Sequence, residues 1–296
     1  MIARLPSPYR LDDAYQRFLN ALETAGFKGE LASDHGLRTV LATDNSIYQR
    51  LPQAAVFPKD YSDVACIAKL AARPEYRSIV LTARGGGTGT NGQSLTDGLV
   101  VDLSRHLNTI LEINVEERWV RVQSGVVKDQ LNAALKPYGL FFAPELSTSN
   151  RATIGGMINT DASGQGSCTY GKTRDHVRAL STVLLGGQRL DSQVMTREMA
   201  NQQAVRQDLI GEVYRCTQGI ADNQQQLINE IFPTLNRCLT GYDLAHLREP
   251  DGRFNLNSIL CGSEGSLGFI VEATLNVLPI PQHSILVNIR YAHKPR

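Results

Sequence analysis

The segment with the clearest chemical meaning is Arg84-Gly-Gly-Gly-Thr-Gly-Thr-Asn-Gly-Gln93. Four of the six residues from 84 to 89 are glycine. The backbone can therefore approach a ligand closely and turn several N–H groups toward one point. Strongly apolar runs at 79–82 and 99–103 flank the segment, a setting that does not suit a flexible surface linker. The pattern predicts a phosphate-binding loop of a kind that fits a diphosphate.

Two well-known phosphate loops do not fit this segment. A P-loop ends in Gly-Lys followed by Ser or Thr, whereas residues 88–91 contain no lysine. The spacing Gly87-x-Gly89-x-x-Gly92 matches the dinucleotide fingerprint, but that fingerprint must open a helix. Here the next strand-like run begins at Leu99, which leaves no room for a crossover helix. We interpret the match as accidental.

Three further segments combine glycine with small polar residues. Ala152-Thr-Ile-Gly-Gly156 lies within residues 144–164, and a Tyr170-Gly171 turn leads into an alternating run that ends at Gly186-Gly187. The third, Cys261-Gly-Ser-Glu-Gly-Ser-Leu-Gly268, precedes a long apolar run. Glycine allows close approach, and Ser, Thr and Asn supply hydrogen-bond donors without bulk. Each segment is suited to the wall of a binding site.

In this order and spacing, from about residue 50 to 281, the four segments resemble the FAD-binding domain of the vanillyl-alcohol oxidase superfamily of flavoproteins, the PCMH type. The glycine loop is similar to the superfamily's pyrophosphate loop. The resemblance implies an α+β, PCMH-type FAD-binding fold, in which a small parallel α/β sub-domain joins a larger antiparallel sheet sub-domain with flanking helices. Thr88 stands where some members have a histidine bonded to the flavin, so the resemblance implies non-covalent FAD.

The resemblance assigns FAD contacts to glycines and small polar residues of these segments, with a few larger neighbours. They are Arg84, Gly85, Gly86, Gly87, Thr88, Gly89, Thr90, Asn91, Gln93, Pro144, Glu145, Ser149, Thr153, Gly155, Gly156, Asn159, Thr160, Ser163, Gly164, Gly171, Glu264, Gly265 and Ile270. At Asp161 the superfamily most often has Asn. We therefore expect this carboxylate to find a donor or to stay away from the phosphates.

Within the superfamily, the sequence looks most like the FAD-linked dehydrogenases of D-2-hydroxy acids, which include the D-lactate, glycolate and D-2-hydroxyglutarate enzymes. Residues 43–48 resemble a segment of large bacterial members that carry a C-terminal iron–sulfur region. The implied reaction passes the α-hydrogen of the hydroxy acid as hydride to flavin N5 while a base takes the hydroxyl proton. The electrons then leave to an acceptor such as a quinone, a cytochrome or a dye.

Two alternatives belong to other classes of function. One is a non-catalytic or truncated FAD-binding module that needs a separate cap domain or a partner chain for activity. The other, a nucleotide-binding scaffold unrelated to flavin, rests on the glycine loop alone. Turnover of a hydroxy acid with a dye distinguishes the enzyme from both.

No catalytic or metal-binding residue is assigned. In the relatives, the substrate arginine, the metal-binding histidines and the catalytic base come from a cap domain beyond the last residue of this sequence. An iron–sulfur cluster or divalent metal is therefore expected only in parts absent from it. The histidines are scattered without ligand spacing and read as structural or solvated. Arg84, Arg151 and Lys172 are candidates for phosphate or carboxylate contacts, although lone basic side chains on loops are usually solvated.

The elements that position these segments follow from the apolar patterning. We expect residues 1–48 to form an N-terminal helical arm and residues 49–281 the FAD-binding domain, with sub-domains at about 49–105 and 106–281. Residues 282–296 begin a truncated cap domain. The expected helices are 11–22, 62–72, 127–135 and most of 208–235; the expected strands are 55–57, 79–82, 99–103, 110–113, 119–122, 176–185, 269–278 and 285–291.

Composition excludes several classes of function. The 30 basic residues nearly balance the 29 acidic ones, so we expect no nucleic-acid partner. The five cysteines are odd in number, far apart and without a C-x-x-C pair, which argues against disulfides and metal clusters. Neither a secretion signal nor a stretch of about 18 apolar residues is present. We expect a cytoplasmic protein, with peripheral contact at the inner face of the membrane and the oligomeric state left open.

Overall fold

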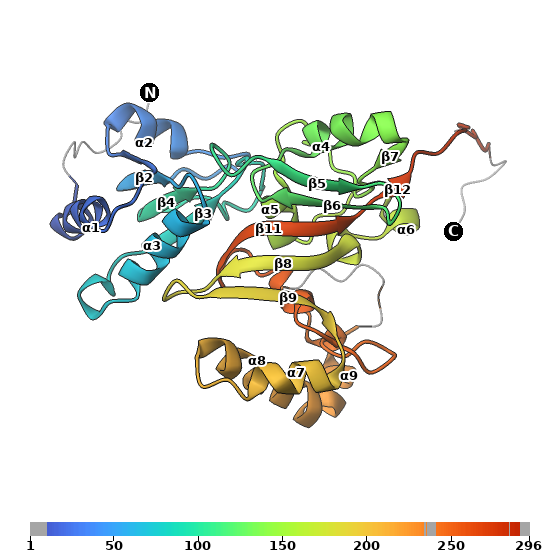
Figure 1. Cartoon of the computed structure of the whole chain (residues 1–296). Helices are drawn as coiled ribbons and strands as arrows, with labels where there is room; N and C mark the ends of the chain where they lie inside the picture. The colour runs from blue at the N-terminus through green and yellow to red at the C-terminus, as the bar shows by residue number, and fades with distance from the viewer. Residues whose placement is uncertain (1–10, 234, 236–240, 284, 291–296) are drawn as a thin grey trace.

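The structure, a computed structural model, describes residues 11–233, 235, 241–283 and 285–290. Two sheet-based parts lie side by side, and a lobe of helices packs below the larger one (Figure 1). The smaller part holds a four-stranded sheet and the larger part a six-stranded sheet. The α+β class expected from the sequence is confirmed.

The smaller sheet has the strand order β1-β2-β4-β3. Strands β2, β4 and β3 are parallel, while β1 is antiparallel to β2. The expected strand–helix–strand unit is present, and β4 lies between its two strands. The elements of this part are α1 (Asp13–Thr24), β1 (Glu30–Ala32), α2 (His35–Leu41), β2 (Ala54–Phe57), α3 (Tyr61–Ala71), η1 (Pro74–Tyr76), β3 (Leu81–Arg84) and β4 (Leu99–Asp102).

Helix α3 shows why this part folds as the pattern predicts. Its N-cap residue Asp60 accepts a hydrogen bond from Asp63 N at 3.0 Å, which satisfies one of the free amides of the first turn. Val64 and Ile67 are fully buried on the face that meets the sheet. Phe18 of α1 belongs to the same core cluster. Part of the stretch expected as an N-terminal arm is therefore packed into the smaller part.

The larger sheet is antiparallel throughout, with the order β10-β9-β8-β11-β6-β5. The hairpin expected at 110–122 is confirmed, and the two longest expected strands, β8 and β11, form the centre. Its strands are β5 (Ile110–Asn114), β6 (Trp119–Gln123), β8 (Val177–Val183), β9 (Arg189–Met195), β10 (Phe254–Asn255) and β11 (Phe269–Asn276). Two further short strands, β7 (Leu140–Phe141) and β12 (Leu278–Pro279), pair with each other.

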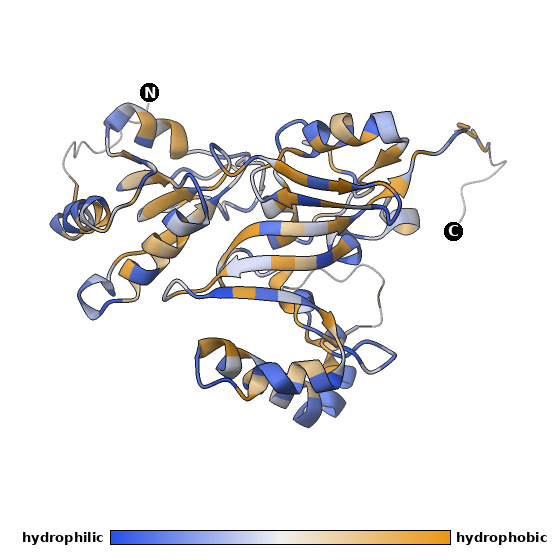
Figure 2. Ribbon diagram, in the orientation of Figure 1, coloured by the Kyte–Doolittle hydropathy of each residue, from blue (hydrophilic) through white to orange (hydrophobic). Residues whose placement is uncertain are grey.

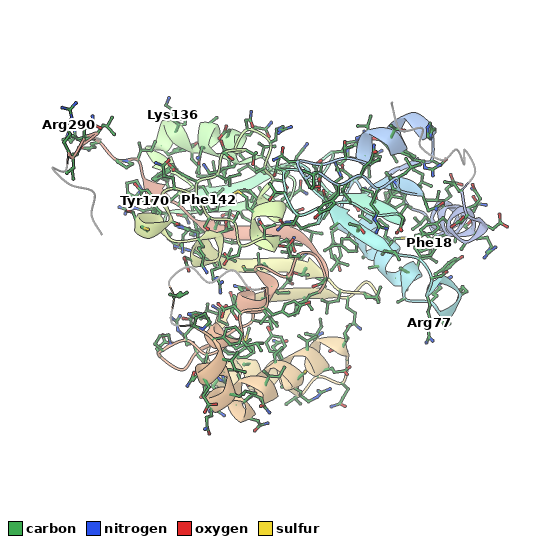
Figure 3. All side chains as sticks on the ribbon, turned by 180° about the vertical axis from the view of Figure 1, so that it is seen from behind. Phe18, Arg77, Lys136, Phe142, Tyr170 and Arg290 are labelled. Carbon is green, nitrogen blue, oxygen red and sulfur yellow. The ribbon has the colours of Figure 1, made fainter. Side chains whose placement is uncertain are left out.

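Short helices pack on the larger sheet and carry its core. Leu131 and Ile154, both fully buried, share one cluster with Val120 and Leu275 of the sheet. Phe142 and Tyr170 lie on this part of the molecule, well away from Phe18 of the smaller part (Figure 3). The helices are α4 (Lys128–Leu135), η2 (Lys136–Tyr138), α5 (Ile154–Asn159), α6 (Ser167–Tyr170), η3 (Thr173–His176), η4 (Leu244–His246) and α10 (Asn257–Leu260).

The helical lobe comprises α7 (Arg197–Ala204), α8 (Leu209–Asn223) and α9 (Gln225–Ile231). Its helices carry hydrophilic and hydrophobic residues mixed along their length (Figure 2), and Tyr214 is buried against Phe254 with the ring centroids 5.9 Å apart. The helices expected within 208–235 are present. Helix α7 was not expected, because Ala200 is its one buried residue and it shows no apolar period.

The strand expected at 285–291 is wrong for residues 285–290, which form no strand; Tyr291 lies outside the described residues. Ile285, Leu286, Val287 and Ile289 are 66–86% exposed, and Arg290 lies at the end of a segment that projects from the body (Figure 3). An alternating apolar run forms a strand only beside another strand, and no described strand pairs with this one.

Two sequence expectations concern membranes and cysteines. No helix in the described part of the chain is long and apolar enough to cross a membrane. The four cysteines that the structure describes, Cys66, Cys168, Cys216 and Cys261, are free; Cys238 lies outside the described residues. Burial raises the pKa of the Cys261 thiol, so this residue packs as a small apolar side chain.

Replacing Phe18 with alanine should remove a fully buried ring that meets Tyr76 edge to face at 5.1 Å. We expect a loss of about 3 to 5 kcal/mol of unfolding free energy, because the cavity left behind cannot close completely. Urea unfolding followed by circular dichroism measures it. The control Ile47→Ala truncates a side chain that is 94% exposed and should change stability by less than about 0.5 kcal/mol; equal effects would contradict the packing described.

Candidate cofactor site

A cavity of about 450 Å³ lies where the two sheets meet. The end of β3 and the glycine loop form one wall, the first turn of α5 and residues 159–163 a second, and the turn before β11 a third. Three of the four segments singled out in the sequence therefore meet in one place. The fourth, after Tyr170, contributes no lining residue.

The glycine loop is pressed against residues 151–153. A Cβ atom at Gly85 would overlap Thr153 Oγ1, and one at Gly86 would overlap the carbonyl oxygen of Arg151. Gly87 has φ +62°, a conformation that favours glycine. The loop can occupy this position only without side chains at 85 and 86, and its backbone then forms a wall of the cavity.

Arg84 holds the start of the loop in place. Its guanidinium donates to the carbonyl oxygens of Thr43 at 2.7 Å, Leu41 at 3.3 Å and Ser94 at 3.4 Å. Burial lowers the pKa of Arg84, and the carboxylates Asp102 and Asp44 oppose this shift. Because most of its donors already have acceptors, Arg84 acts as a strut between the loop and residues 41–43.

Helix α5 places the second wall. The Thr153 hydroxyl caps it by accepting from Gly156 N at 3.3 Å, and Gly155 N donates to Ser124 O at 2.7 Å. A Cβ atom at Gly155 would lie 2.7 Å from Ser124 Cβ. Gly155, which was expected to allow close approach of a cofactor, therefore allows close approach of Ser124, the residue that follows β6.

Among the described residues that line the cavity, two buried hydroxyl groups have no hydrogen-bond partner. They are Ser124 Oγ and Ser163 Oγ. An unpaired buried hydroxyl is costly, so both are suited to bond an occupant of the cavity. Ser163 was expected from the sequence, whereas Ser124 was missed because it follows a strand and belongs to none of the glycine-rich segments.

The turn at Glu264 and Gly265 closes the cavity from the side of β11. Asn159 fixes it: its carbonyl oxygen accepts from Glu264 N at 2.9 Å, and its Oδ1 accepts from Gly265 N at 3.0 Å. Glu264 has φ +54°, a strained conformation for a residue with a side chain. Burial raises the pKa of the Glu264 carboxyl, while a hydrogen bond with Gln93 opposes the shift.

Asp161 also lines the cavity, and its carboxylate has found donors, as expected. It accepts from Arg174 Nε at 2.6 Å and lies 3.2 Å from Lys172 Nζ. Arg174 also pairs with Asp243, which in turn lies 2.6 Å from His246 Nδ1. Asp161 is 2% exposed, so this is a buried network. Lys172 is thereby committed to a structural ion pair.

The expected contact residues divide into two sets. Those that line the cavity are Arg84, Gly85, Gly86, Gly87, Thr88, Gly89, Thr90, Gln93, Thr153, Gly155, Gly156, Asn159, Thr160, Ser163, Glu264, Gly265 and Ile270. Those placed outside its lining are Asn91, Pro144, Glu145, Ser149, Gly164 and Gly171. Gly164 packs on the Glu145 backbone, where a Cβ atom would overlap the carbonyl oxygen. Lining residues that the sequence did not suggest include Leu103, Ser124, Leu146 and Met157.

No group of three or more His, Cys, Asp or Glu side chains within the described ranges is arranged to hold a metal ion. Of the histidines, His176 is buried with its ring 5.8 Å from that of Phe142, and His106 lies 2.7 Å from Glu30. Both make protein contacts outside the cavity, as expected for structural histidines.

Replacing Asp161 with asparagine should destabilise the protein, because Lys172 and Arg174 would keep their buried charges and lose their shared carboxylate. Asparagine suits the φ of +44° at this position, so backbone strain does not confuse the result. We expect a loss of about 3 to 5 kcal/mol in urea unfolding. The control Asp251→Asn breaks an exposed pair with Arg253 and should leave the unfolding midpoint unchanged. A stable Asp161→Asn variant would refute the network.

The comparisons with known proteins agree with this geometry. Residues 52–192 match the family of FAD binding domains. The chain is 69% identical over 277 residues to D-2-hydroxyglutarate dehydrogenase of Pseudomonas putida. The aligned region covers 94% of this chain and 28% of that protein. It is 56% identical over 275 residues to the enzyme of the same name from Escherichia coli, covering 93% of this chain and 27% of that protein. The chain thus spans little more than a quarter of these relatives.

A solved structure shows the same fold at low identity. An alkyldihydroxyacetonephosphate synthase aligns over 95% of this chain and 44% of its own, with a TM-score of 0.64 and 19% identity. The cavity, with its glycine-rich wall and the two unpaired hydroxyls at Ser124 and Ser163, also fits FAD, the cofactor named by the matched family. Residues 52–192 of this chain therefore belong to the family of FAD binding domains.

Proposed function

We propose that this chain is the FAD-binding part of a flavoprotein dehydrogenase that oxidises a D-2-hydroxy acid to the 2-oxo acid, with D-2-hydroxyglutarate as the first candidate substrate. The four relatives of 55–69% identity all carry the name D-2-hydroxyglutarate dehydrogenase. More distant relatives, at about 29–30% identity, are named for glycolate and D-lactate. All of these names support a 2-hydroxy acid as the class of substrate, whereas only some of them support D-2-hydroxyglutarate itself.

The observation that carries the proposal is the cavity between the sheets. Residues 85–89 line it and four of them are glycine, so little side chain covers the loop's backbone, which suits the diphosphate of FAD. Ser124 and Ser163 offer hydroxyls to the rest of the cofactor. Thr88 stands where some members of the superfamily have the histidine that bonds to the flavin, so the loop itself forms no covalent bond with FAD. When bound, FAD supplies the acceptor for hydride; this chain binds and orients it.

The substrate carboxylates require cations that the described lining does not offer. Arg84 is the one basic residue among the described lining residues, and its guanidinium is bonded to backbone carbonyls. Lys172 and Arg174 are held in the Asp161 network. We infer that carboxylate recognition and the catalytic base come from residues outside this lining. The electrons pass to a separate acceptor, such as a quinone or a cytochrome.

Replacing Gly86 with alanine should lower FAD affinity at least about tenfold, because a Cβ atom there overlaps the Arg151 carbonyl oxygen and must move the loop. Quenching of FAD fluorescence during titration measures the affinity. The matched control is Gly219→Ala on helix α8, where the nearest atom is 3.9 Å from the added Cβ. Its FAD affinity should equal that of the unaltered protein, and an unchanged affinity in Gly86→Ala would contradict the assignment of the loop.

The second test concerns the reaction. The chain is mixed with FAD, its flavin spectrum is recorded, and D-2-hydroxyglutarate or its L enantiomer is added without oxygen. We expect FAD uptake but no bleaching at an enzymatic rate by the chain alone, because carboxylate recognition and the base are inferred to lie outside the cavity lining. Bleaching and dye reduction by the D enantiomer alone would show that this chain carries out the whole reaction. FAD uptake without bleaching by D-2-hydroxyglutarate, D-lactate or glycolate would favour a binding module that needs another domain. Failure to bind FAD would contradict both the dehydrogenase and the FAD-binding module.

A further inference from the structure

The charges that line the cofactor cavity are not equally compensated. The described lining contains three charged residues, Arg84, Asp161 and Glu264. Arg84 donates to carbonyl oxygens, and Asp161 is paired with Lys172 and Arg174. Glu264 has no ion pair with any described residue and makes its side-chain hydrogen bond to the neutral amide of Gln93. Glu264 is exposed to solvent, so in the protein alone water, and not a cation, compensates the charge of its carboxylate.

Glu264 is fixed close to the glycine loop. The two bonds from its turn to Asn159 set its backbone, and a Cβ atom at the next residue, Gly265, would lie 3.7 Å from that of Ala83 in β3. Gln93, its hydrogen-bond partner, also accepts from Asn91 N at 3.1 Å with its Oε1. The carboxyl group is thus joined through a single side chain to the loop expected to hold the diphosphate.

A bound cofactor changes the surroundings of this carboxyl group in two ways. The diphosphate of FAD carries negative charge, which disfavours a second negative charge nearby. The cofactor also displaces the solvent that reaches Glu264 through the open cavity, and desolvation disfavours the ionised form. Both effects act in the direction in which burial already shifts the group in the protein alone.

We propose that Glu264 takes up a proton when FAD binds, so that the affinity for FAD falls as the pH rises. The proposal rests on the proposed function, because it requires FAD in this cavity. A protonated carboxyl removes the repulsion and supplies an O–H donor to a cofactor oxygen. Glu264 then lines the cavity and also positions the cofactor and helps to determine the affinity for it.

The pH window follows from the direction of the shift. The pKa of Glu264 is already above its ordinary value in the protein alone, and it is higher still in the complex. Below both pKa values the carboxyl is protonated in both states and the affinity is constant. Between them the dissociation constant rises by up to about tenfold per pH unit, and above both it is constant again.

The other ionisable groups around Glu264 do not produce this dependence. Asp161, at the end of α5, stays paired with two cations, and Arg84 on β3 stays charged throughout the range. Tyr242 reaches the same turn through a 2.6 Å hydrogen bond between its hydroxyl and Ser266. No histidine lies among the described lining residues.

Calorimetric titration with FAD, from about pH 5 to about pH 8.5, tests the proposal on the whole 296-residue chain. Two buffers with different protonation heats report the number of protons taken up per FAD. We expect uptake of up to one proton and an affinity that weakens at least several-fold across the range. Glu264→Gln keeps the side chain's shape and its backbone demand; it should bind FAD with no pH dependence and more tightly than the unaltered protein at the alkaline end.

The matched control is Glu116→Gln, the same change at an exposed position in the turn between β5 and β6, and it should retain the full pH dependence. An equal pH dependence in Glu264→Gln, or none in the unaltered protein, overturns the proposal while FAD binding stands. Absence of FAD binding at every pH overturns the proposed function as well. If Glu264→Gln fails to fold, the unaltered protein still tests the proposal, because FAD binding without proton uptake overturns it.

Discussion

The close contact between the glycine loop and residues 151–153 is the constraint on which the site depends. The loop belongs to the smaller sheet, and the segment it touches leads into α5 of the larger part. Two positions without a Cβ atom let the backbones of the two parts approach directly, so one cavity forms between them. A larger residue at either position would separate the parts and open that cavity. If the loop holds FAD as proposed, cofactor recognition and the joining of the two sheets are the same interaction.

Charge compensation of Asp161 makes the proposed FAD site compatible with an acid in its wall. Asp161 is neutralised from behind by Lys172 and Arg174, and Arg174 reaches Asp243, which follows the helical lobe along the chain. The segment after the lobe thus helps to fix the turn at the end of α5. The described part of this segment contributes no lining residue to the cavity, but it still contributes to the position of the cavity wall.

Much of the fold could be predicted because its elements are strongly periodic. The parallel unit around α3, the hairpin of β5 and β6, and the central strands β8 and β11 all follow apolar runs. Helix α7 could not be predicted, since a single alanine on it is buried. The strand expected at 285–290 failed for the opposite reason: its pattern is strong, but a strand also needs a neighbour, which a local pattern does not reveal.

The candidate site could be predicted only in part, because some of its residues become neighbours only in the folded structure. Glycine-rich segments show backbone approach in the sequence itself, whereas Ser124 enters the cavity only because β6 ends beside Gly155. The role of Arg84 was likewise hidden, because its carbonyl partners at Leu41, Thr43 and Ser94 become neighbours only in three dimensions. Its residue type indicated a phosphate contact, whereas in the structure the Arg84 guanidinium donates hydrogen bonds to backbone carbonyl oxygens.

The projecting segment at 285–290 has a consequence for handling this protein in solution. Ile285, Leu286, Val287 and Ile289 are exposed in an extended run without proline or acidic residues. Runs of this composition pair readily with the unprotected edges of other sheets and seed aggregates. Self-association that grows with protein concentration, and that added charge within this run suppresses, is the behaviour to be expected from such a surface.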